Sequence, residues 1–246
     1  MFRTADRHAL AALRERIARI ERGDNRADGR VAPVGPAAID SCLADGGLAF
    51  GTLHEAMGGG PDTEHAAAAT LFLASILARQ DGPVLWVLRR LDLFAPGLAG
   101  VGLRAERLLF VEAGKDVLAA AEEGLRHPGL TAVVAEVEGR LALVASRRLR
   151  LAAEQSGVLG LLVRRSLAFD DPVLLEPSAA TTRWRVTRPP SAPAGFLGRG
   201  HWRLDLLRDR DGKSSSWIVE EADATGRLSL VATAADRPDQ AIRRRA

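Results

Sequence analysis

Residues 34–58 read VGPAAIDSCLADGGLAFGTLHEAMG, and this stretch decides the fold. Its first part predicts a helix over 37–44, which ends before a glycine pair because glycine disfavours helix. A strand is predicted around 52–56. The segment MGGGPDTEH at 57–65 then leads from this strand into a helix over 64–79. A strand, a glycine-rich loop and a helix in this order are typical of α/β proteins that bind phosphate groups.

Strands and helices continue to alternate after this opening unit. Further strands are predicted at 84–88, 107–111, 131–137 and 158–163. Helices are predicted at 117–125 and 141–155. Because such connections form right-handed crossovers, the alternation predicts an α/β fold with a mainly parallel sheet.

The pattern changes after residue 182, where strands follow one another without helices. RWRV, WRLDLLR and SWIVEE are the candidate strands, and Asp211 and Gly212 suit a tight turn between the last two. These segments predict antiparallel strands at one edge of the sheet. We therefore expect the core to span 37–233, with a C-terminal β hairpin, and a frayed basic tail at 234–246.

An amphipathic helix is predicted at the N-terminus, over 1–22. Leu10, Leu13, Ile17 and Ile20 recur at spacings of three and four between charged residues. Residues 23–36 have no apolar period and many turn residues, which predicts a linker. The apolar stripe either folds back on its own core or docks on another chain. It is the first candidate site for partner binding or self-association.

Composition limits the class of protein. With 246 residues, 47% of them hydrophobic, the chain can bury a sizeable core. The single cysteine, the charged N-terminal residues and the lack of a long apolar run predict a cytoplasmic protein that does not enter a membrane. Basic residues are almost all arginine, with lysine only at positions 115 and 213. Arginine suits phosphate recognition, so the composition permits nucleic-acid binding.

The glycine-rich loop lacks the residues that bind ATP. A Walker loop ends in Gly-Lys-Ser/Thr so that a lysine and a hydroxyl reach phosphate and metal. The loop offers Gly58, Gly59 and Gly60, but Glu64 and His65 stand where Gly and Lys are needed, and alanine replaces the hydroxyl residue. We expect the loop to bind ATP poorly or not at all, and we expect no cofactor, no metal site and no catalysis. Glu136 and Glu138, at the end of a predicted strand, are expected to cap the next helix.

The quoted stretch resembles the entrance of the RecA core. The residues that carry this likeness are Gly35, Ile39, Asp40, Leu43, Gly46, Gly47, Leu48, Gly51, Leu53 and Glu55. Counting the alternating core, the likeness covers roughly residues 34–221. It implies a RecA-like three-layer fold.

Among RecA relatives, the chain is most similar to the ImuA family. Leu-His-Glu at 53–55 and the C-terminal run WRLDLLRDRDG, followed by Trp217, carry this resemblance. It implies a non-catalytic adaptor in SOS-induced translesion DNA synthesis. Its partner would be an ImuB-type inactive homologue of Y-family polymerases, which acts with an error-prone C-family DNA polymerase. A SulA-like inhibitor that binds the cell-division GTPase is the alternative.

The resemblance also assigns residues to sites. Arg89 and Arg90 stand where RecA has its catalytic glutamate, and Glu136 replaces the Walker B aspartate. Arg208 and Arg210 match basic residues that reach a neighbouring subunit, which leaves open a subunit interface or DNA phosphates. The RecA segments that bind single-stranded DNA correspond to two arginine-bearing stretches. Their candidate residues are Arg140, Arg147, Arg148, Arg150, Arg164 and Arg165. Trp184 and Trp202 are candidates for stacking on bases.

Overall fold

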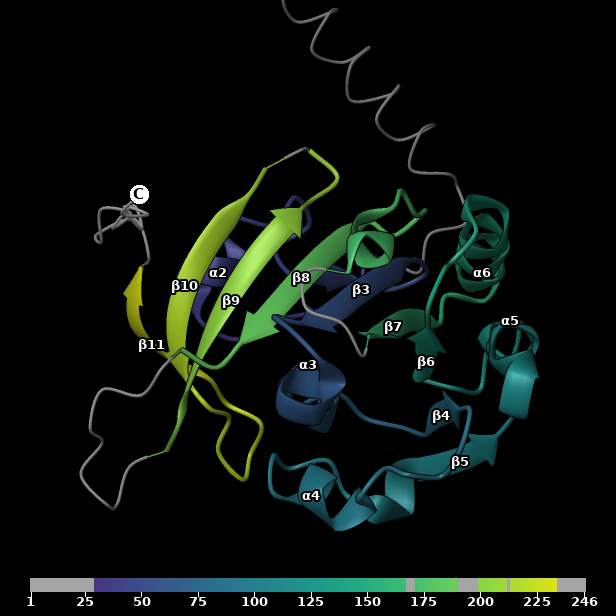
Figure 1. Ribbon diagram of the computed structural model, residues 1–246, viewed down its shortest axis with the longest axis horizontal. Helices are drawn as coiled ribbons and strands as arrows, with labels where there is room; N and C mark the ends of the chain where they lie inside the picture. Colours follow the sequence, from purple (N-terminus) through teal and green to yellow (C-terminus); the bar gives the residue numbers. More distant parts are fainter. Residues whose placement is uncertain (1–28, 167–170, 190–198, 212, 234–246) are drawn as a thin grey trace, which may run out of the picture.

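A computed structural model describes residues 29–166, 171–189, 199–211 and 213–233. Within these residues, one nine-stranded sheet runs through the molecule in the order β11-β10-β9-β8-β3-β7-β6-β4-β5 (Figure 1). Its strands are β3 (Leu53–Gly58), β4 (Val84–Leu88), β5 (Leu108–Glu112), β6 (Ala132–Glu138), β7 (Leu159–Arg165), β8 (Thr182–Thr187), β9 (His201–Arg208), β10 (Ser215–Glu220) and β11 (Ser229–Thr233).

The sheet is parallel from β5 through β8 and antiparallel from β8 through β11. The predicted mainly parallel sheet with antiparallel C-terminal strands is therefore confirmed. One detail differs, because β8, the strand of the RWRV segment, pairs in parallel with β3 as well as antiparallel with β9.

Helices cover both faces of the parallel part of the sheet. They are α2 (Ala37–Asp40), α3 (Asp62–Ala78), α4 (Ala95–Ala99), α5 (Val117–Leu125) and α6 (Leu143–Ser156), with short 3-10 turns η1 (Ala105–Arg107), η2 (Gly114–Asp116) and η3 (Pro172–Leu175). The sheet curves around α3, whereas α5 and α6 lie together beyond β4, β6 and β7 (Figure 1). This is the three-layer arrangement that the RecA resemblance implies.

Two apolar cores follow from the alternation of side chains along the strands. In β6, Val134 belongs to the core around α3, whereas Val133 belongs to the core under α5 and α6. Phe72 of α3 packs against Trp184, with ring centroids 5.5 Å apart. Trp184 and Trp202 are both fully buried. The hypothesis that they stack on bases is wrong for this fold, because their rings fill the core.

The domain begins earlier than the sequence predicted. Residues 29–36 were assigned to a linker, but β1 (Val31–Ala32) pairs with β2 (Leu48–Ala49). Arg79, at the end of α3, donates hydrogen bonds to the carbonyls of Pro33 and Val34, at 2.6 and 2.8 Å. This segment is therefore part of the core. A helix was predicted over 37–44, but only its first half is helical, as α2.

Some predictions concern residues outside the described ranges. The N-terminal helix with Leu10, Leu13, Ile17 and Ile20 and the tail at 234–246 belong to this group. No helix of the described chain is long and apolar enough to cross a membrane.

His54 joins three strands near the centre of the sheet. It is fully buried in β3, and its Nε2 donates to the Ala49 carbonyl of β2 at 3.0 Å. Its Nδ1 must then accept from the Thr182 hydroxyl of β8, at 2.8 Å, and that oxygen accepts from Trp184 Nε1 at 2.9 Å. Burial lowers the pKa of His54 to about 4. The imidazole is therefore neutral at pH 7.

This buried imidazole predicts acid sensitivity. Between pH 7 and pH 5, an unfolded histidine with a pKa of about 6.5 gains a proton that His54 excludes, so the free energy of unfolding falls by about 2 kcal/mol as the pH falls. Urea titrations at the two pH values measure this loss. His54→Gln removes it, whereas His201→Gln, at an exposed position of β9, keeps it. An unchanged pH dependence in His54→Gln would show that another group causes the loss.

Candidate functional site: the phosphate-loop position

The glycine-rich loop lies where the sequence predicted it. It leaves the carboxyl end of β3 at Gly58 and enters α3 at Asp62. The carboxyl ends of β4, β6 and β7 meet at the same edge of the sheet, because these strands are parallel to β3. This is the edge where open α/β sheets bind their ligands.

The loop is occupied by contacts within the protein. A Cβ on Gly58 would lie 2.8 Å from the Cβ of His65, and a Cβ on Gly59 would overlap the side chain of Thr187. Two backbone N–H groups of the loop already have partners within the protein. Gly59 donates to the Val186 carbonyl at 3.1 Å, and Asp62 donates to the Ser166 carbonyl at 2.7 Å. These glycines therefore serve close packing. The side chain of Glu64 is outside the described part of the structure.

An arginine occupies the centre of this edge. Arg165, at the end of β7, donates to Asp62 at 2.7 Å and to Glu136 at 2.7 Å, and it lies 3.3 Å from Asp92. We call these four residues the Arg165 cluster. Burial lowers the pKa of Arg165, but the hydrogen bond to Asp62 and the three carboxylates outweigh this effect and raise the pKa above its usual value. The guanidinium is therefore always charged.

The two glutamates at the end of β6 do not cap a helix, so that expectation is wrong. Glu136 is nearly buried, and its Oε1 accepts from Trp86 Nε1 at 2.9 Å while its Oε2 accepts from Arg165. Glu138 pairs with Arg89 at 3.0 Å. Helix α6 begins only at Leu143, without a side-chain cap. Both oxygens of the Walker B counterpart thus have partners, and the described residues contain no cluster suited to a metal ion.

Two of the predicted DNA-binding arginines lie inside the protein. Arg164 is 2% exposed, donates to the Gly139 carbonyl at 2.8 Å and lies 3.8 Å from Glu55. Arg165 belongs to the cluster at the loop. Arg164 is buried, and the half-buried Arg165 is engaged by three carboxylates, so we leave both out of any DNA surface. Sequence alone could not indicate this, because their carboxylate partners are distant in the chain.

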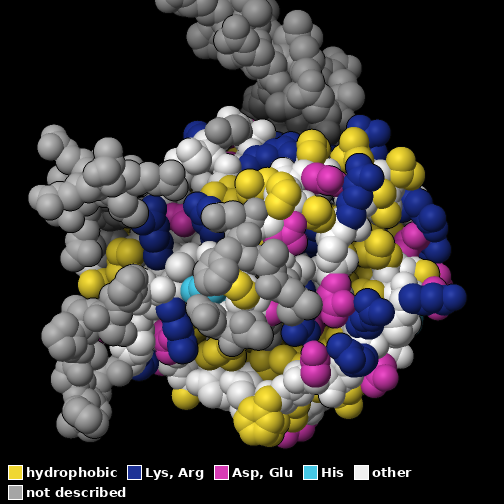
Figure 2. All heavy atoms as spheres, in the orientation of Figure 1, with side chains coloured by type: hydrophobic (Ala, Val, Ile, Leu, Met, Phe, Trp, Pro, Cys, Tyr) yellow, Lys and Arg dark blue, Asp and Glu magenta, His cyan; other side chains and the backbone are white. Residues whose placement is uncertain are grey.

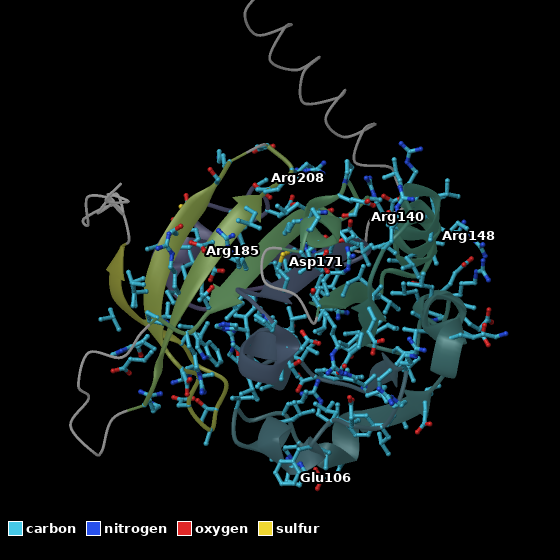
Figure 3. All side chains as sticks on the ribbon, viewed as in Figure 1. Glu106, Arg140, Arg148, Asp171, Arg185 and Arg208 are labelled. Atoms are coloured by element: carbon cyan, nitrogen blue, oxygen red, sulfur yellow. The ribbon has the colours of Figure 1, made fainter. Side chains whose placement is uncertain are left out.

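The other four arginines of that prediction lie on the surface, at and around α6. Arg140 pairs with Glu176 at 2.9 Å, Arg148 with Glu122 at 2.7 Å and Arg150 with Glu154 at 2.7 Å. Arg147 makes no ion pair within the described ranges. Figure 3 shows Arg140 and Arg148 on different sides of the helix. DNA contact by these residues stays a prediction.

The β9–β10 turn carries the two arginines assigned to an interface. Arg208, labelled in Figure 3, ends β9 and is exposed. Arg210 lies 3.4 Å from Asp45. Asp209, between them, is buried and accepts from the Ala44 N–H at 3.1 Å. The turn is therefore held against the segment before β2, and Arg208 projects from it.

Known proteins resemble the chain in sequence and in fold. Protein ImuA of Caulobacter vibrioides is 39% identical over 203 residues, which are 77% of this chain and 83% of that protein, and the same values hold for two strains. The chain belongs to the ImuA family. No family model matches the chain.

The fold comparison agrees with this family assignment. The crystal structure of the RadB recombinase superposes with a TM-score of 0.58 at 14% identity, covering 81% of this chain and 99% of RadB. At this identity the likeness concerns the fold alone. The ImuA family member described here therefore has a RecA-like α/β fold, as the sequence predicted.

The Arg165 cluster predicts a large loss of stability when its arginine is removed. Arg165→Met leaves nearly buried Glu136 and Asp62 without their cation, and we expect the free energy of unfolding to fall by about 3 kcal/mol in urea titrations. Arg140→Met removes one exposed ion pair and should cost less than about 1 kcal/mol. Equal effects of the two substitutions would contradict a central role for the cluster.

Proposed function

We propose that this ImuA family protein is a non-catalytic RecA-like adaptor of translesion DNA synthesis. One observation carries the proposal: the Arg165 cluster and the packed glycine loop fill the position where a RecA-like ATPase holds phosphates. The loop also lacks the Walker lysine and hydroxyl. An adaptor works through binding surfaces alone, so it does not need a nucleotide site.

Membership of the ImuA family supports the biological setting. We infer damage-induced mutagenesis as the process and an ImuB-type homologue of Y-family polymerases as the direct partner. The error-prone C-family polymerase would join through that partner. Homo-oligomer formation and contact with single-stranded DNA belong to the same proposal as further possibilities to test.

We place the partner contact at strand β5, by analogy with a RecA-type subunit interface. In the described chain β5 pairs only with β4, so its outer edge offers free backbone groups. Beside this edge lies a groove of about 590 Å³, lined mainly by apolar residues that include Leu85, Leu109 and Leu130. Leu109 is half exposed. An extended apolar segment of the ImuB-type partner fits such an edge, because strand addition satisfies the backbone and the groove takes alternate side chains.

The proposal predicts that restoring Walker residues does not restore nucleotide binding. A chain with Glu64→Gly, His65→Lys and Ala66→Thr has the required side chains, but the backbone of Gly59 still packs against Thr187 and Arg165 still holds Asp62 of the loop. Titration with a fluorescent ATP analogue and Mg²⁺ should show no saturable binding, as for the unaltered chain. Stoichiometric binding or hydrolysis by the unaltered chain would refute a non-catalytic role.

The proposal also predicts a partner that depends on the β5 edge. We expect the ImuB-type protein of the same organism to co-purify with this chain, and Leu109→Asp to weaken the complex by about tenfold or more. Leu230→Asp, at an exposed position of β11, is the matched control. The pair Leu13→Asp and Ile17→Asp tests the N-terminal stripe in the same assay. Filamentous cells on overexpression, with no effect on damage-induced mutation, would favour the SulA-like alternative.

A further inference from the structure

The two most exposed apolar side chains of α6 are Val144 and Leu151. Val144 is 68% exposed and Leu151 is 55% exposed. Their separation of seven positions falls about 20° short of two helical turns, so both side chains point the same way. Ser146, Leu149 and Ala153 lie on the opposite, buried side of the helix. Val144 and Leu151 thus form a ridge, which we call the α6 ridge. Apolar residues seven apart are the spacing at which a second helix packs.

Arginines flank the α6 ridge. Arg148 is 65% exposed, whereas the Glu122 carboxylate that holds it is almost buried. A guanidinium fixed in this way loses little freedom when it binds a second carboxylate. Arg147 lies between Val144 and Leu151 in the sequence. It is exposed and makes no ion pair in the described chain. The surface therefore combines an apolar ridge with the unpaired positive charge of Arg147 and the exposed guanidinium of Arg148.

A further exposed apolar side chain lies in η3, close to the segment that packs on α6. The Arg140–Glu176 ion pair and a 3.0 Å hydrogen bond from the Ala179 N–H to the Ser146 hydroxyl hold the segment after η3 against this helix. Leu175, next to Glu176, is 60% exposed. Figure 2 shows arginine side chains interspersed with apolar ones over the region of α6.

We propose that the α6 ridge, with Arg147 and Arg148, binds an acidic amphipathic helix of a partner protein. This inference rests on the adaptor function proposed above and names a second contact of the same assembly. Apolar residues of the partner helix would pack on Val144 and Leu151. Its acidic residues would lie on either side and pair with the two arginines.

Other occupants fit this surface less well. DNA would place phosphates against the apolar ridge, and neighbouring arginines diverge by about 100° around the helix, so they do not follow one backbone. The stripe at 10–22 of this chain carries four arginines and two glutamates, so its charge has the same sign as that of the ridge. A second copy of α6 is basic for the same reason. Charge complementarity therefore favours an acidic protein segment.

The test uses the full chain with a photo-crosslinking amino acid at position 151, co-expressed with the ImuB-type protein and the C-family polymerase of the same organism. We expect a crosslink to one segment of either protein that is acidic and has apolar residues every three or four positions. The same group at position 230, on β11, is the control and should not reach that segment. Crosslinks only to DNA, to a second copy or to residues 1–28, or no crosslink at all, would overturn the inference.

Two substitutions test the contact without disturbing the helix. Val144→Glu adds an acid to the first turn of α6, where the helix dipole favours it, and Leu151→Glu lies four residues after Arg147. Both variants should keep the thermal midpoint of the unaltered chain yet bind the crosslinked partner about tenfold more weakly. Unchanged affinity of both variants would overturn the inference.

A charge exchange separates this contact from the β5 edge. Arg147→Glu should weaken the complex, and lysine in place of an acidic residue in the crosslinked segment should restore it. If the partner co-purifies and responds to Leu109→Asp but not to the α6 variants, the inference fails and the proposed function stands. If no partner co-purifies, both fail.

Discussion

The guanidinium of Arg165 holds the carboxyl edge of the parallel sheet together. It joins the end of β7 to the beginning of α3 through Asp62, to the end of β6 through Glu136, and to the segment after β4 through Asp92. Three segments that are distant in the sequence are thereby tied to one guanidinium. The cluster stabilises the loops at this edge of the sheet.

A second buried cluster lies one residue away on the other side of β7. Neighbouring residues of a strand point to opposite faces, so Arg164 turns toward Glu55 while Arg165 turns toward Asp62. Arg183 of β8 also binds Glu55, at 2.9 Å, and donates to the carbonyls of Leu175 and Glu176. This cluster fixes residues 175–178 before β8, and the adjoining Ala179 packs against α6. The two arginines that resembled a DNA-binding pair are therefore the parts that make the sheet edge rigid.

The strands and helices could be predicted from the sequence because the spacing of apolar residues within each element is a local property of the chain. The strands β4 and β6 and the helix α5 appear within a residue of their predicted positions, and the break in pattern after residue 182 marks the antiparallel strands. Elements without a long period were missed, namely β1, β2, α4 and β11. The ion pairs could not be predicted, because Arg165 and its carboxylate partners are 29 to 103 residues apart in the chain. These residues come together only in the folded chain. The sequence alone reveals just one feature of this site, the absence of the Walker lysine.

A closed nucleotide site changes what a RecA-like domain can do. Hydrolysis normally drives such a domain between states of different affinity, and a ligand shifts an equilibrium only by its differential affinity for the two states. In the non-catalytic role proposed above, the domain lacks that source of energy. Its affinity for partners then depends on surfaces that are always present. The free edge of β5 and the outward face of α6 are the two surfaces proposed for these contacts, and both belong to the parallel half of the sheet. Two contacts made at once raise the affinity of an assembly without a chemical step. An adaptor built in this way holds its partners by the number of contacts and not by the state of a nucleotide.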